Sequence, residues 1–133
     1  MANTTIPSSL HDLFASKALA NLAVITKSGL PMVSPVWVDL DGNNVLINSE
    51  AKRVKSQNMD VGSKVALSIV DPGNPFRYIG VQGEVVERRV NGADAHIDKL
   101  SQRYTGKSPY PWRQPGDQRV LFVIKPIRVK ARE

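Results

Sequence analysis

The chain has 133 residues, of which 41% are hydrophobic and 23% charged, so we expect one globular domain spanning residues 1–133 rather than a disordered segment. It carries a net charge of +6 and no cysteine, which excludes a disulfide scaffold, thiolate-bound zinc, an iron–sulfur cluster and a cysteine nucleophile. No apolar run reaches the ~20 residues that span a bilayer, and residues 1–7 lack a signal-peptide pattern, so we expect a soluble cytoplasmic protein.

The first part of the chain predicts a short helix followed by three strands. Residues 8–17 place apolar side chains at helical spacing. Residues 19–27 and 32–40 are apolar and β-branched and flank a Gly/Pro turn, which predicts a hairpin; a further turn leads into a strand at residues 44–48. Pro35 removes a backbone donor, so it predicts an edge, a bulge or a rim that faces a ligand.

The second part predicts two helices among three further strands. Residues 50–59 are typical of a helix, with Ser49 as its N-cap. Another helix begins after Asn91, which we expect to cap it, and ends before a Gly/Pro-rich loop at residues 105–118. The strands are predicted at residues 64–70, 76–90 and 119–132.

The order of these elements favours an antiparallel barrel with peripheral helices over the regular alternation of a doubly wound sheet. Gly80 and Gly83 interrupt the long strand. They indicate a bend of the barrel, or the close approach of another backbone or a ligand.

A cluster of basic residues, Lys52, Arg53 and Lys55, follows the third strand at the start of a predicted helix. Helix N-termini favour anions, and Arg and Lys bind phosphate, so the cluster is a candidate phosphate site. A solvated face of the helix is the alternative. Residues 67–133 carry 12 basic and 7 acidic side chains, a balance that suits nucleic acid, a phosphorylated ligand or simply solubility.

The sequence contains no nucleophile–base constellation and no spacing typical of metal ligands. His11 and His96 lie far apart on predicted helices, where we expect both at the surface. We therefore predict no catalytic side chain and no metal site, and a cofactor would carry any redox chemistry. Trp37 and Trp112 are candidates for stacking on a ring.

The segments LANLAVITKSGLPMVSPVWVDLDGNNVLINS, AKRVKSQNM, YIGVQGEVV, YPW and RVLFVIKPIRV occur in this order along nearly the whole chain. Together they resemble the pyridoxamine 5'-phosphate oxidase-like split β-barrels, and among these the flavin/deazaflavin-dependent oxidoreductases. The resemblance implies a mainly β split barrel with peripheral helices. It also implies a homodimer with two cofactor sites at the subunit interface.

The resemblance assigns the cofactor phosphate to Arg53 and Lys55, with Asn58 nearby. It places the second strand against the ring system, and it adds contacts from the segment before the basic turn, the long strand and the YPW loop. The residues so implied are Val33, Ser34, Pro35, Val36, Ile47, Asn48, Ser49, Gln82, Tyr110 and Trp112.

The YPW loop and the C-terminal strand look most like the branch that uses the 8-hydroxy-5-deazaflavin coenzyme F-420, with FMN as the alternative. The implied function is an oxidoreductase that transfers a hydride to or from a small organic substrate. Two alternatives stay open: a split barrel that holds a flavin or haem without turnover, and a nucleic-acid-binding barrel. The second is disfavoured because aromatic residues are only 6% of the chain, and such binders need stacking platforms.

Overall fold

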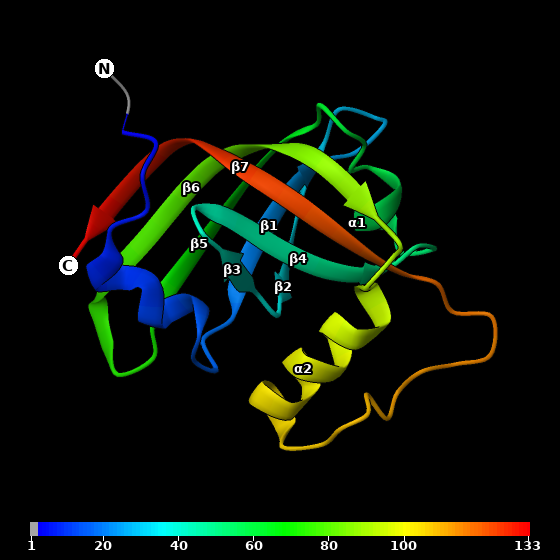
Figure 1. Cartoon of the computed structure of the whole chain (residues 1–133). Coiled ribbons are helices and arrows are strands. Elements are labelled where there is room, and N and C mark those ends of the chain that lie inside the picture. Colours follow the sequence, from blue (N-terminus) through cyan, green and yellow to red (C-terminus); the bar gives the residue numbers. More distant parts are fainter. Residues whose placement is uncertain (1–2) are drawn as a thin grey trace.

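The computed structural model describes residues 3–133, which form a strongly curled antiparallel sheet with helices at its periphery (Figure 1). The strand order is β2-β1-β5-β6-β7-β4-β3. The strands are β1 (Ala20–Ile25), β2 (Pro31–Val36), β3 (Asp39–Asp41), β4 (Asn44–Glu50), β5 (Lys64–Asp71), β6 (Asn74–Arg89) and β7 (Arg119–Arg132). The helices are a 3₁₀ helix η1 (Ser8–Phe14), α1 (Val54–Gln57) and α2 (Ala93–Thr105). The predicted mainly β barrel with peripheral helices is confirmed.

The two edge strands of the sheet, β2 and β3, are neighbours in the chain, separated only by Trp37 and Val38. This link brings the two ends of the sheet together and closes the barrel along a seam. The predicted single strand 32–40 is therefore wrong: its first half pairs with β1 and its second half with β4. Pro35 lies in the edge strand β2, where a missing backbone donor is tolerated.

Side chains of α2 satisfy the backbone at the seam. The Val38 N–H donates to the Tyr104 hydroxyl at 3.2 Å, and the Val38 carbonyl accepts from Arg103 at 2.8 Å. The Tyr104 hydroxyl in turn donates to the Ala18 carbonyl at 2.7 Å. Because buried backbone groups need partners, these bonds explain how the chain can change strand partners here.

The barrel core consists of the inward-facing side chains of the strands, among them Leu22, Ile69 and Phe122, which are almost fully buried. Leu10, Leu13 and Phe14 of η1 are buried in the same cluster, as their spacing predicts. The helix ends at Phe14, earlier than the predicted residue 17, and it is a 3₁₀ helix.

The helix α2 begins on the outer face of β4 and β7, where Ala93 packs with Leu46, Leu121 and Val123. Its N-cap is Gly92, with φ of 80°, rather than the predicted Asn91, and Asp94 lies in its first turn. The structure of residues 3–133 contains no helix that is both long and apolar enough to cross a membrane.

Gly83 allows β7 to approach β6 closely at a bulge. A Cβ added there would lie 2.6 Å from Cγ2 of Ile124 and 2.8 Å from the carbonyl oxygen of Lys125. The register shifts between Gln82 and Gly83, so this glycine marks both a bend of the barrel and the close approach of another backbone strand, as the two predicted alternatives describe. Gly80 has no comparably close neighbour.

The predicted helix 50–59 is much shorter than expected. Only Val54–Gln57 is helical, and the N-cap is Arg53, which makes no side-chain capping bond. Ser49, the predicted cap, lies in β4 and is buried. The segment from β4 to α1 is thus mainly a turn, and it presents its basic side chains from a loop.

Candidate functional site

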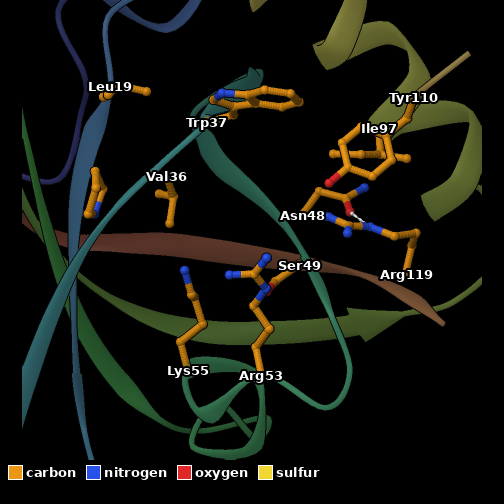
Figure 2. Close-up of a pocket in the computed structure, with 11 residues that line it drawn as sticks. Leu19, Val36, Trp37, Asn48, Ser49, Arg53, Lys55, Ile97, Tyr110 and Arg119 are labelled. Atoms are coloured by element: carbon orange, nitrogen blue, oxygen red, sulfur yellow. Dashed lines mark hydrogen bonds between the residues drawn. The ribbon is translucent and has the colours of Figure 1, made fainter. Parts of the chain in front are cut away.

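A pocket of about 290 Å³ opens beside the seam, between β2, β4, the turn after β4 and the loop that follows α2 (Figure 2). The pocket combines a basic side with an apolar and aromatic side. It is lined by Leu19, Pro35, Val36, Trp37, Asn48, Ser49, Arg53, Lys55, Ile97, Tyr110 and Arg119.

The basic side consists of Arg53, Lys55 and Arg119, and Figure 2 shows Arg53 and Lys55 rising from the turn into the pocket. None of the ion pairs formed within residues 3–133 involves any of these three side chains. The nearby Glu50 carboxylate instead accepts from the Lys52 N–H at 2.6 Å. The pocket lining therefore contains three cations and no carboxylate, although the charges of Asp117 and Glu50 act on Arg119 from outside the lining.

Burial and the repulsion between neighbouring positive charges lower the pKa values of Lys55 and Arg119. Burial lowers the pKa of Lys55, and the charges of Arg53 and Arg119 lower it further. Burial is also the main cause of the lowered pKa of Arg119, which is only 7% exposed. Burial and repulsion both disfavour the charged forms of these side chains. A bound anion would stabilise the charged forms and so offset both effects.

The predicted contribution of a helix dipole to this site is wrong, because α1 has only four residues. A helix this short has few aligned peptide units, so the side-chain charges must provide the attraction for an anion. Of the three members of the predicted basic cluster, Arg53 and Lys55 line the pocket and Lys52 does not.

Arg119 is the basic residue that sequence reasoning missed. Its Nε donates to Oδ1 of Asn48 at 2.9 Å, and its guanidinium lies 5.2 Å from the centroid of the Tyr110 ring (Figure 2). It is the first residue of β7 and pairs in register with Glu50 of β4. Only this register places it next to the basic turn, and no local motif signals it.

The aromatic side is built around Trp37. Its ring stacks on Tyr104 with centroids 5.1 Å apart and planes 5° apart, and it meets the edge of Tyr110 at 6.1 Å. Tyr110 in turn contacts Trp112 at 5.6 Å. Trp37 lines the pocket, whereas Trp112 does not and is 48% exposed. A rigid aromatic surface of this kind suits a planar ring.

Several of the cofactor contacts implied by the resemblance lie together in this pocket. They come from the second strand, from the end of β4, from the basic turn and from the YPW loop. These residues are Pro35, Val36, Asn48, Ser49, Arg53, Lys55 and Tyr110.

The remaining implied contacts lie elsewhere on this protomer. Val33 is 63% exposed on the outer face of β2, and Ile47 is fully buried in the core. Ser34 pairs with Leu22, and its buried hydroxyl has no partner within the described chain. Asn58 donates to the Val54 carbonyl at 2.7 Å and so closes the short helix.

Gln82 lines a second cavity, of about 440 Å³, on the outer face of the sheet. This cavity has a mainly apolar lining from β1, β5, β6 and β7, including Ile25, Ala66 and Ile127. Gln82 therefore does not reach the basic pocket of its own chain.

His96 is not at the surface, contrary to expectation; only 9% of its side chain is exposed. Its Nε2 lies 3.0 Å from Oδ2 of Asp39, which also accepts from Lys99 at 3.1 Å, while Oδ1 accepts from Arg103 at 2.7 Å. Burial raises the pKa of Asp39, but these partners and the Leu40 N–H outweigh it and hold that pKa well below its ordinary value. His11 is exposed, as predicted.

No group of three metal-ligating side chains is found among residues 3–133. The pocket lining likewise contains no carboxylate and no imidazole among those residues. The site can therefore bind an anion and a planar ring, but it offers neither a metal centre nor a carboxylate or imidazole base.

Comparison with known proteins gives consistent results. Residues 6–133 match the family model described as pyridoxamine 5'-phosphate oxidase. A solved structure described as an F420 reductase is 31% identical, with a TM-score of 0.81 over 94% of this chain and 98% of that chain. A search of curated proteins finds no match.

Two more distant structures show the fold alone. HupZ from Group A Streptococcus is 20% identical, with a TM-score of 0.65 over 96% of this chain and 94% of that chain. A conserved hypothetical protein from Mycobacterium tuberculosis is also 20% identical, with a TM-score of 0.69 over 98% of this chain and 87% of that chain.

Proposed function

The chain belongs to the pyridoxamine 5'-phosphate oxidase family, and from this premise we propose that it is an oxidoreductase that binds coenzyme F-420 or FMN in the basic pocket. One observation carries the proposal: three cations without a carboxylate partner within the described chain face a pocket whose other side is aromatic. Both cofactors combine a planar ring with a phosphate, and this pocket offers a surface for each.

Arg53 and Lys55 would hold the cofactor phosphate, because both point into the pocket and neither is neutralised within residues 3–133. Val36 and Trp37 would lie against the ring, where Trp37 is held rigid by its stack on Tyr104. The cofactor, when bound, supplies the hydride chemistry. Because the described lining has no carboxylate or imidazole, we expect solvent to provide the accompanying proton.

Of the two proposed cofactors, we favour coenzyme F-420. The support is the 31% identity, over nearly the full length of both chains, to the structure described as an F420 reductase. The several free cations of the pocket also suit a cofactor with an anionic tail. The proposed substrate is a small organic molecule that gives or accepts the hydride.

We also propose that the protein is a homodimer. The pocket, at about 290 Å³, is at the lower end of the ~300–1,000 Å³ typical of small-molecule sites, so a second copy could complete it. Val33 and Ile25 are exposed on the outer face of the sheet, and the apolar cavity beside Gln82 lies on that face too. An obligate interface should bury above ~2,000 Å². Light scattering that gives a clean monomer of 14.6 kDa would contradict the dimer.

The function is tested by titrating the purified protein with F-420 and with FMN and following the fluorescence of the ring. We expect saturable binding of at least one cofactor, with F-420 tighter. Absence of binding for both would overturn the proposal. A Soret band in the spectrum of the purified protein would instead favour a haem-binding barrel.

A further inference from the structure

A chain of buried polar groups runs from Asp39, behind α2, to Arg119 in the pocket. Asp39 Oδ2 lies 3.0 Å from His96 Nε2, and His96 Nδ1 lies 3.1 Å from Asn48 Nδ2. Asn48 Nδ2 also lies 2.8 Å from the Ala93 carbonyl, and Asn48 Oδ1 lies 2.9 Å from Arg119 Nε. Figure 2 shows the last of these bonds, with the Arg119 guanidinium directed toward the middle of the pocket. This series of polar contacts links residues of β3, α2, β4 and β7.

The partners of Asn48 fix the orientation of its carboxamide. A carbonyl only accepts hydrogen bonds and the Arg119 Nε–H only donates, so the Asn48 amide nitrogen must face Ala93 and its oxygen must face Arg119. The second N–H of that amide then points at His96 Nδ1, which must accept. This leaves the proton of the neutral ring on Nε2, from which it is donated to Asp39.

The charges around Asp39 are consistent with a neutral His96. Lys99 and Arg103, both on α2, already face the same carboxylate. Arg119 on β7 faces the other end of the chain and adds a further positive charge. His96 therefore serves Asp39 as a hydrogen-bond donor, and a third positive charge beside that carboxylate is not needed.

We propose that His96 and Asp39 are positioning residues that hold Arg119 in the pocket through Asn48. The proposal rests on the proposed function, because it takes the pocket to be the cofactor site. Arg119 is buried, forms no ion pair within residues 3–133, and makes its one side-chain hydrogen bond there with Asn48. Its other contact in the pocket, with the face of the Tyr110 ring at 5.2 Å, is less directional, so the Asn48 hydrogen bond is what fixes the direction of Nε.

Loss of the acceptor at His96 Nδ1 would leave one Asn48 N–H without its partner. If the carboxamide then turned over, its amide nitrogen would face the Arg119 Nε–H and its oxygen would face the Ala93 carbonyl. Both contacts are repulsive, so a flip cannot satisfy the free N–H. The carboxamide can regain a partner for this buried donor only by shifting, and a shift also moves the oxygen that accepts from the Arg119 Nε–H.

The first test needs no variant. Proton–nitrogen correlation spectra of the histidine rings in the cofactor-free wild-type protein should show the His96 ring protonated on Nε2 and unprotonated on Nδ1. Protonation on Nδ1, alone or together with Nε2, would overturn the proposal.

The second test compares His96→Phe with His96→Gln, which keeps one acceptor and one donor, and with His11→Phe as the control on the exposed histidine. The slowly exchanging Nε–H of Arg119 should persist in the wild type, in His96→Gln and in His11→Phe, and be lost in His96→Phe. Retention in a folded His96→Phe protein would overturn the proposal, because it would show that Arg119 is held without His96.

The third test measures the dissociation constant for FMN in the same proteins. We expect His96→Phe to bind about two- to tenfold more weakly, the scale of one net hydrogen bond, and His96→Gln to restore the affinity. In an Arg119→Ala background His96→Phe should have no further effect. An unchanged constant in His96→Phe refutes the positioning role alone, whereas no FMN or F-420 binding by the wild type refutes the proposed function and the role of Arg119 with it.

Discussion

Two groups of cations in this protein differ in what neutralises them. Lys99 and Arg103 share the buried carboxylate of Asp39, so their charges are satisfied within the fold. Arg53 and Lys55 face a pocket and form no ion pair among the described residues. Lys55 is half-buried, and a half-buried charge without a counter-charge is unfavourable. The first group of cations therefore contributes to the fold, whereas under the proposed function the second group binds the cofactor phosphate.

The largest expected effect is at the carboxylate of the first group. Asp39→Asn leaves Arg103 and Lys99 without their counter-charge, and breaking a buried pair in this way costs about 3–5 kcal/mol. We expect this loss in the free energy of unfolding, measured by urea denaturation at neutral pH. The exposed neighbour Asp41→Asn is the matched control and should change it little.

The pH dependence of the same variant follows from the pKa of Asp39, which is lowered in the folded protein. The stability that Asp39 contributes is present above its ordinary pKa of 3.8 and is lost as the pH falls toward its lower folded value. The wild type and Asp39→Asn should therefore converge in stability as the pH falls below about 4. A constant difference between them down to pH 2 would argue against this account.

Substitutions in the second group of cations, Arg53 and Lys55, should change the affinity for the cofactor rather than the stability of the fold. Arg53→Ala or Lys55→Ala should weaken FMN and F-420 binding about ten- to a hundredfold, because each removes a charge-assisted hydrogen bond worth ~1.5–3 kcal/mol. The melting temperature without cofactor should stay the same or rise slightly, since one repelling charge is gone. Lys17→Ala and Lys27→Ala, both at exposed positions, should change neither property.

A smaller effect is expected from the titration of Lys55, whose pKa lies below its ordinary value of 10.5 because of burial and the charges of Arg53 and Arg119. As the pH rises toward that lowered pKa, the ammonium loses its charge and the affinity for FMN should fall, by about fivefold at most. Lys55→Arg should keep its affinity to higher pH. A wild-type affinity that stays flat up to pH 10.5 would contradict the predicted direction.

The smallest effect is expected where an ion pair is present but exposed. Asp60 lies 3.4 Å from Arg88, and 81% of its side chain is accessible to solvent. Asp60→Asn should lower the free energy of unfolding by less than ~1 kcal/mol, because water screens such pairs. A loss comparable to that of Asp39→Asn would show that burial is not what makes the ion pairs of Asp39 stronger than this exposed pair.

Most of the fold could be predicted from the sequence because its signals are local. Alternating apolar residues mark the strands, and Gly/Pro turns separate them. The partner switch at Trp37 and Val38 leaves no such signal: Val36 and Val38 are both buried, so the alternation continues unchanged through the seam. The helix α1 is shorter than predicted because residues 50–59 have a helix-compatible composition, but Glu50 is the last residue of β4 and residues 51–53 form a turn before the helix begins.

The residues of the candidate site also divide into those that a local sequence signal predicts and those that it does not. Arg53 and Lys55 could be found because they follow a predicted strand directly in the sequence. Arg119 and His96 could not, since Arg119 reaches the pocket only through the register of β7 with β4, and His96 is buried where α2 brings it against Asp39 of β3 and Asn48 of β4. Long-range pairing, rather than any property of the neighbouring residues, decides where these two side chains lie.

The most direct test of the central claim compares FMN with riboflavin, which lacks the phosphate, by calorimetric titration of the wild type and of the Arg53→Ala/Lys55→Ala double variant. We expect the wild type to bind FMN about ten- to a hundredfold more tightly than riboflavin. We also expect this preference to disappear in the double variant, with the riboflavin affinity unchanged. A wild type that binds both ligands equally, or a double variant that keeps the preference, would show that these two cations do not hold a phosphate.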